Sequence, residues 1–167
     1  MRRIIAFLAG VLSAVFGCGQ QRPSAGDPQG RDLAVAVPSD DESMRAATRQ
    51  ARESLDRFIE RLSAPGPSQG DFSIKVAVHA GEGTHYLWLQ IVSFDGAHFH
   101  GALGTDAAGI EGHAPGERVE VDRAGVEDWM YLEAGKLVGG FSLRAIRDRL
   151  AGEARKQFER SMWFAFE

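Results

Sequence analysis

Phe72-Ser73-Ile74-Lys75-Val76-Ala77-Val78-His79 is the segment that decides the fold class. Its large apolar residues occupy every second position, which is the period of a strand with one buried face. Upstream, residues 44–62 carry apolar side chains at spacings of three and four, which is the period of a helix with one buried face. This change of period predicts a helix followed by a sheet.

The helix has clear limits in the sequence. Ser39 followed by Glu42 fits a capping box, and acidic residues at this point favour the positive end of the helix dipole. Pro65-Gly66-Pro67 cannot continue a helix. We therefore expect one helix over residues 39–64, packed on the sheet.

Further strands are predicted downstream. Residues 85–94 are apolar on both faces and should be central, and Asp95-Gly96 is a strong hairpin signal. The segments expected to complete the sheet are residues 97–103, 117–121, 126–132 and 136–139. A last helix should start near Ser142, and Gly152 is a point at which it can break. The prediction is an α+β fold: an antiparallel, strongly bent sheet of five to six strands with an N-terminal and a C-terminal helix packed on one face.

The register of the hairpin is left open by the sequence. A two-residue loop places His98 and His100 on the face of Leu89, and a three-residue loop places them on the face of Trp88. A slip of one residue turns every side chain to the other face. Both registers remain alternatives.

The N-terminus has the pattern of a secretion signal. Two arginines precede the short apolar run of residues 4–16, and Gly17 precedes Cys18, the single cysteine of the chain. This ending resembles the lipobox of bacterial lipoproteins, although Phe16 departs from it; the alternative is ordinary cleavage that leaves Cys18 as a thiol. We predict a lipoprotein signal peptide over 1–17, a flexible Pro-, Gly- and Ser-containing tether over 18–38, and one α+β domain over 39–167.

Lipidation of Cys18 would anchor the domain to the membrane through fatty chains. The expected location is the bacterial cell envelope, facing the periplasm, and Gly19 favours the outer membrane over the inner. Removal of Arg2 and Arg3 leaves 17 basic against 23 acidic residues, a formal charge of −6 where the whole chain has −4. An acidic protein repels phosphate backbones, so no nucleic-acid partner is expected.

Two segments resemble a known family. They are Val126-Glu127-Asp128-Trp129-Met130-Tyr131, and Gly135 followed by Gly139-Gly140-Phe141-Ser142 and Arg144. They are similar to the signature of the YegJ-like proteins, domain of unknown function 2314, over residues 41–150. The resemblance implies an α+β domain with no established activity. The family usually has Asn and Pro after the Gly-x-Leu of the third strand, where this chain has Gly104-Thr105-Asp106.

The signature residues have two interpretations. In the structural one, Trp129 and Tyr131 fill the core and Asp128 pairs with Arg144, which ties a strand to the start of the last helix. In the functional one, an aromatic groove near these residues and Trp88 binds a partner. Alternation alone does not separate them.

Catalysis has little support in the sequence. His98 and His100 lie two apart on one strand face and are the best metal-ligand candidates, but no recognised ligand motif surrounds them. No serine stands in a nucleophile turn, and no cofactor is implied. We expect a non-catalytic envelope protein that binds a protein or an envelope component. The alternatives are a metal-assisted or other hydrolytic enzyme using the two histidines, and an immunity-type inhibitor of a toxin.

Overall fold

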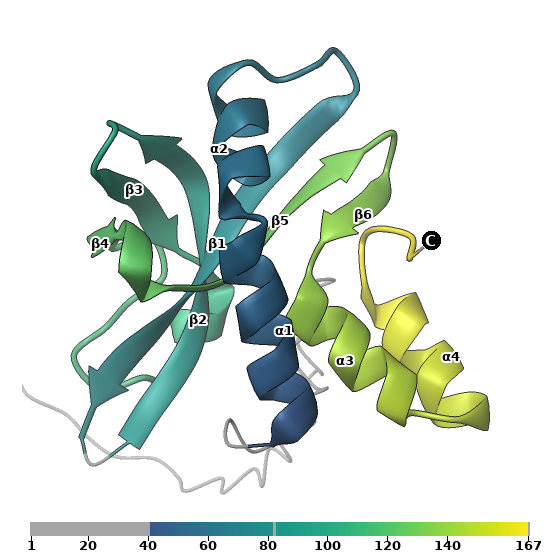
Figure 1. The fold of residues 1–167 in the computed structure, drawn as a ribbon. Coiled ribbons are helices and arrows are strands. Elements are labelled where there is room, and N and C mark those ends of the chain that lie inside the picture. The colour runs from purple at the N-terminus through teal and green to yellow at the C-terminus, as the bar shows by residue number, and fades with distance from the viewer. Residues whose placement is uncertain (1–40, 82, 167) are drawn as a thin grey trace, which may run out of the picture.

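The computed structural model describes residues 41–81 and 83–166. Within them, six strands form one antiparallel sheet in the order β4-β3-β2-β1-β5-β6. Their bounds are β1 Gln69–Ala80, β2 Gly83–Phe94, β3 His98–Leu103, β4 Arg118–Asp122, β5 Val126–Glu133 and β6 Lys136–Gly139. The sheet is strongly curled (Figure 1). The predicted α+β class with an antiparallel sheet is confirmed, and the run predicted to be central, now β2, is an inner strand.

Four α-helices accompany the sheet in the described residues. Their bounds are α1 Glu42–Glu53, α2 Leu55–Ser63, α3 Phe141–Arg149 and α4 Gly152–Ser161, and short 3-10 turns cover η1 Thr105–Ala107 and η2 Arg123–Gly125. The helices α1 and α2 cross one face of the sheet, which we call the helix face, and α3 and α4 lie near the β6 end (Figure 1). No helix of the described residues is both long enough and apolar enough to span a membrane.

The single N-terminal helix predicted from the sequence is two helices. Asp41 caps α1 by accepting a hydrogen bond from the Ser43 amide at 2.9 Å, whereas Ser39 of the predicted capping box lies outside the described residues. At the break, the Ser54 hydroxyl donates to the Gln50 carbonyl at 2.6 Å. A serine that bonds back to the preceding turn bends a helix. The break separates the buried Ala51 of α1 from α2.

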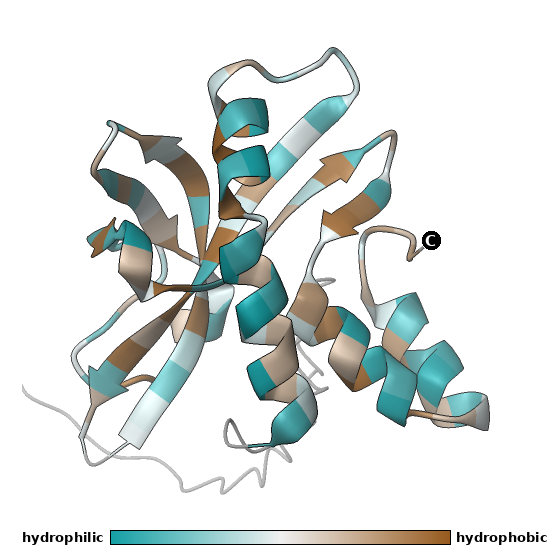
Figure 2. Ribbon diagram, in the orientation of Figure 1, coloured by the Kyte–Doolittle hydropathy of each residue, from teal (hydrophilic) through white to brown (hydrophobic). Residues whose placement is uncertain are grey.

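The main core lies between the helix face and α1 with α2. Phe58 of α2 is its centre, with its ring centroid 5.3 Å from that of Trp129 and 6.2 Å from that of Phe99. The Trp129 indole donates to the Ala51 carbonyl at 2.9 Å, which fixes α1 against β5. Brown strand segments behind largely teal helices show the same division in Figure 2.

The β2–β3 hairpin has neither predicted register. Phe94 pairs with Phe99, so four residues separate the paired positions, and the last of them, His98, is the first residue of β3. Ile91 has a φ of 54° and lies where the register shifts between Gln90 and Ser93, so β2 contains a bulge. In a regular hairpin, an even number of connecting residues would place His98 and His100 on the face of Leu89. The bulge turns the residues that follow it in β2 to the other face, so the histidines lie on the Trp88 side.

After the last helix, the C-terminal residues fold back onto the sheet. Gly152, at a φ of 55°, begins α4, so the break predicted there is present. Residues 162–166 then return beside β6, where Ala165 exchanges backbone hydrogen bonds with Gly135 and Leu137 at 3.0 and 2.9 Å. Phe164 packs there on Met130, which alternates with the core residue Trp129. The tail therefore covers part of the sheet face opposite α1 and α2, which we call the back face.

Candidate functional site

A row of charged and aromatic side chains crosses the back face. Lys75 of β1 pairs with Trp88 of β2 on one side and with Asp128 of β5 on the other. Residues paired across antiparallel strands lie on the same face, with their Cβ atoms about 5 Å apart. The row therefore places one cation between an aromatic ring and a carboxylate, and we call Lys75, Trp88, Tyr86 and Asp106 the lysine site.

Lys75 is the centre of the lysine site. Its ammonium lies 5.8 and 5.9 Å from the ring centroids of Tyr86 and Trp88, and it donates to the Ser142 hydroxyl at 3.3 Å. Burial lowers the pKa of Lys75, and the nearby carboxylates of Asp128 and Asp106 oppose that shift. Aromatic rings at this distance stabilise an ammonium group through their quadrupoles.

Asp128 joins β5 to the start of α3. Its carboxylate accepts hydrogen bonds from the amides of Trp129, Phe141 and Ser142 at 2.8, 3.2 and 2.7 Å, and from the Ser142 hydroxyl at 2.7 Å. Asp128 has no exposed surface, and this burial raises its pKa although the hydrogen bonds oppose the rise. A carboxylate at a helix N-terminus satisfies amides that have no partner within the helix. Asp128 is therefore the cap of α3.

The predicted ion pair between Asp128 and Arg144 is wrong. Arg144 donates instead to the carbonyls of Gly139 and Leu137 at 2.9 and 2.6 Å. Both carbonyls belong to β6, so Arg144 ties α3 to that strand. The cation that faces Asp128 is Lys75, one strand away.

Asp106 lies next to Trp88, at the end of the row opposite Asp128. It lies in η1, and its carboxylate accepts a hydrogen bond from the Trp88 amide at 2.9 Å. Partial desolvation raises its pKa. A Cβ on Gly104 would lie 2.9 Å from an Asp106 carboxylate oxygen, so glycine allows the loop to approach β2 this closely. Asp106 stands in the loop where this chain departs from the usual pattern of the resembling family.

The predicted aromatic groove is divided by the sheet. Trp129 and Tyr131 are each 1% exposed and fill the main core, stacked at 6.2 Å between ring centroids. Trp88 is half-buried on the back face beside Tyr86, which is 38% exposed. Trp129 and Tyr131 therefore have the structural role of core residues. Of the residues predicted to bind a partner, only Trp88 and Asp128 lie in the row on the back face.

The sequence did not predict the lysine site. Lys75, Asp106 and Ser142 come from three separate segments that only the folded sheet brings together. The available signal was Lys75, a lysine between the apolar residues Ile74 and Val76 of a predicted strand. Ser142 is 4% exposed and its hydroxyl is bound to Asp128, so its role is structural and not that of a nucleophile.

The predicted histidines lie on the same back face, further toward the β3 and β4 edge. The imidazoles of His98 and His100 lie 3.2 and 2.9 Å from carboxylate oxygens of Asp122 in β4 and Asp95 in the hairpin loop, and each side chain is 40% exposed. Among residues 41–81 and 83–166, no three His, Cys, Asp or Glu side chains are already arranged to hold a metal ion.

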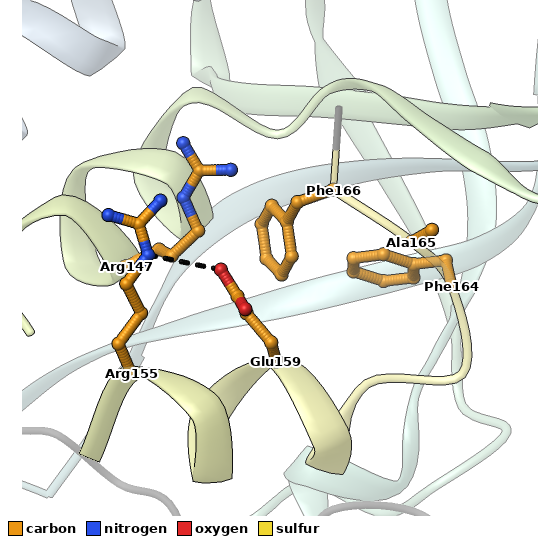
Figure 3. Close-up of a pocket in the computed structure, with 6 residues that line it drawn as sticks. All are labelled: Arg147, Arg155, Glu159, Phe164, Ala165 and Phe166. Atoms are coloured by element: carbon orange, nitrogen blue, oxygen red, sulfur yellow. Dashed lines mark hydrogen bonds and ion pairs between the residues drawn. The ribbon is translucent and has the colours of Figure 1, made fainter. Parts of the chain in front are cut away.

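A hollow of about 300 Å³ lies between α3, α4 and the tail (Figure 3). Arg155 forms an ion pair with Glu159 at 3.1 Å, and the Arg147 guanidinium lies 5.0 Å from the Phe166 ring centroid. These charged side chains thus contact one another or the tail, so the hollow belongs to the packing of the tail against α3 and α4.

The curled antiparallel sheet, with a strand carboxylate capping the helix that follows, defines a small α+β domain. The chain belongs to the family of domain of unknown function 2314, described as an uncharacterised protein conserved in bacteria, whose model matches residues 41–166. This confirms the resemblance seen in the sequence. Asp128, Ser142 and Arg144, which lie in the signature segments, form the connections that join β5, β6 and α3.

Two relatives extend the comparison. The chain is 25% identical to the uncharacterised protein YegJ of Escherichia coli strain K12 over 120 residues, 72% of this chain and 77% of the relative. It is 28% identical to a putative ankyrin repeat protein of Neisseria meningitidis serogroup B over 138 residues, 78% of this chain but 54% of the relative. No solved structure matches the chain.

Proposed function

We propose that the chain is a lipid-anchored protein of the bacterial cell envelope whose domain binds a protein or another envelope component without catalysis. The sequence of residues 1–18 supports the anchor, with acylation at Cys18 and a periplasm-facing domain, in the outer membrane rather than the inner. These residues lie outside the described part of the chain, so the support is the pattern alone.

The lysine site is the observation that carries the binding proposal. Its ammonium is half-buried between two rings, and among the described residues its one hydrogen bond is the contact with Ser142. Two N–H groups of Lys75 have no hydrogen-bond partner among the described residues, and Tyr86 offers an exposed aromatic surface beside them. Tyrosine and tryptophan are enriched at surfaces that recognise a partner, and both stand beside the ammonium here.

The absence of catalysis in this proposal rests on the same geometry. Ser142 is the hydroxyl nearest to Lys75, and its proton is donated to the buried carboxylate of Asp128. Activation as a nucleophile would require a base that removes this proton at a site open to substrate. Ser142 does not meet the second condition, because its residue is only 4% exposed and its hydroxyl bonds to a fully buried carboxylate.

The anchor is tested by mass spectrometry of the protein isolated from its native membrane. We expect an acylated Cys18 at the mature N-terminus, and a Cys18→Ala variant released from the membrane fraction. An unmodified thiol on the native protein, or recovery of the parent chain in the cytosol, would contradict the anchor.

The binding surface is tested by a photo-reactive amino acid placed at Tyr86, with cross-linking in intact cells. The matched control places the same residue at Arg61, an exposed position on α2. We expect a discrete adduct from Tyr86 that disappears in a Lys75→Met background, and none from Arg61. Equal adducts from both positions, or none from Tyr86, would refute the lysine site as the binding surface.

A further inference from the structure

Five ionisable side chains meet at the β3 and β4 end of the back face. His98 and His100 of β3 pair across the strands with Asp122 and Glu120 of β4. Asp95 joins them from the β2–β3 loop, where its carboxylate lies beside both imidazoles. We call these five residues the histidine cluster.

Asp95 is held in place by its own loop. One carboxylate oxygen, Oδ1, accepts hydrogen bonds from the amides of Ala97 and His98 at 2.9 and 2.8 Å. The other oxygen, Oδ2, lies 2.9 Å from His100 Nε2 and 3.9 Å from His98 Nδ1. One fixed oxygen therefore faces one nitrogen of each imidazole.

The remaining imidazole nitrogens also face carboxylates. His98 Nε2 lies 3.2 Å from Asp122 Oδ1, and His100 Nδ1 lies 3.5 Å from Glu120 Oε2. Histidines that bind metals commonly donate their second N–H to a carboxylate, which fixes the ring and makes the ligating nitrogen more basic. In the cluster, a carboxylate oxygen lies within 3.5 Å of the second nitrogen of each ring, which is close enough to take up this role.

We propose that His98, His100 and Asp95 bind a divalent transition-metal ion of the Zn²⁺ type. Ligand atoms around a tetrahedral zinc ion lie about 3.3 Å apart, given bond lengths near 2.0–2.1 Å. The distances of 2.9 and 3.9 Å from Asp95 Oδ2 lie on either side of that value. The set has three protein ligands, which leaves the fourth position of a tetrahedral site to water.

Binding requires a small movement of the rings. Their centroids are 6.5 Å apart, whereas two imidazoles on one tetrahedral ion have centroids about 5 Å apart. Both side chains are 40% exposed, so they rotate without disturbing the core. The proposal concerns residues outside the lysine site and does not rest on the proposed function.

The test is calorimetric titration of Zn²⁺ into the full chain carrying Cys18→Ala, so that the thiol does not compete. We expect one ion per chain with a Kd in the micromolar range or tighter, and no binding of Mg²⁺, which prefers oxygen ligands. A His98→Ala/His100→Ala variant should bind at least 100-fold more weakly. The matched control, His79→Ala/His85→Ala, also removes two imidazoles from one hairpin and should bind as the parent does.

Two further measurements are independent of the double variant and its folding. Asp95→Asn keeps an oxygen for the loop amides but removes the charged ligand, and should weaken Zn²⁺ binding at least tenfold. Co²⁺ added to the Cys18→Ala chain should give the visible absorption of a tetrahedral site. Millimolar or absent Zn²⁺ binding, unchanged binding by His98→Ala/His100→Ala, or its loss in the control variant would overturn the proposal.

Discussion

Replacement of Asp128 by alanine should be among the most destabilising single changes in the domain. The carboxylate is fully buried and accepts four hydrogen bonds, three of them from backbone amides that include the first turn of α3. Each buried donor left without a partner costs about 1–3 kcal/mol. Because these contributions overlap, we expect a loss of about 3–5 kcal/mol in the free energy of unfolding.

The assay for Asp128→Ala is urea denaturation followed by circular dichroism. With a slope of about 2 kcal/mol per molar urea for a domain of this size, the midpoint should fall by about 2 M. Glu127→Gln is the control, because Glu127 is the preceding strand residue but forms a surface ion pair with Arg52 at 3.0 Å. It should cost less than about 1 kcal/mol. A loss below about 1 kcal/mol for Asp128→Ala, or equal losses for both variants, would refute the capping role.

Three other predictions follow from single side chains. Ile91→Asn should raise the free energy of unfolding by about 1 kcal/mol and increase Tm, because an exposed β-branched residue at a φ of 54° is strained; a lower Tm would contradict this. Trp129→Phe should lower it by about 2–3 kcal/mol in urea denaturation, because the indole bond to Ala51 is lost and a cavity is left; an unchanged midpoint would contradict that role. Hydrogen bonds from the His98 amide and the His100 ring hold the pKa of Asp95 well below its usual value, so its stabilising effect is present above about pH 4 and is lost as pH falls below that. Thermal melts from neutral to acid pH should therefore show a smaller decline for Asp95→Asn than for the parent, and identical declines would contradict it.

The strands were predictable because apolar residues alternate with polar ones in several of them, and because the run of residues 85–94, apolar on both faces, lies between turn signals. The break between α1 and α2 was not, because the apolar spacing continues through it while one hydroxyl, that of Ser54, bonds to the turn before. The bulge in β2 was also hidden, since isoleucine is among the residues least suited to a positive φ. On the opposite strand, a Cβ on Gly101 would lie 3.1 Å from the Gln90 carbonyl oxygen, a tight contact, so glycine allows β3 to pass close to the bulge.

The partner of Asp128 shows why the site itself escaped prediction. The sequence predicted Arg144 as the partner of Asp128 because Arg144, sixteen positions away, was expected just inside the last helix. Two facts of tertiary structure decide otherwise. The amides at the start of α3 are closer competitors for the carboxylate than any side chain of that helix. The pairing of β1 with β5, two strands far apart in the chain, then brings Lys75 beside Asp128 and between Asp128 and Trp88. A lysine in a buried strand becomes interpretable only when both neighbouring strands are known, so the register of the sheet, and not the charge pattern, identifies the site.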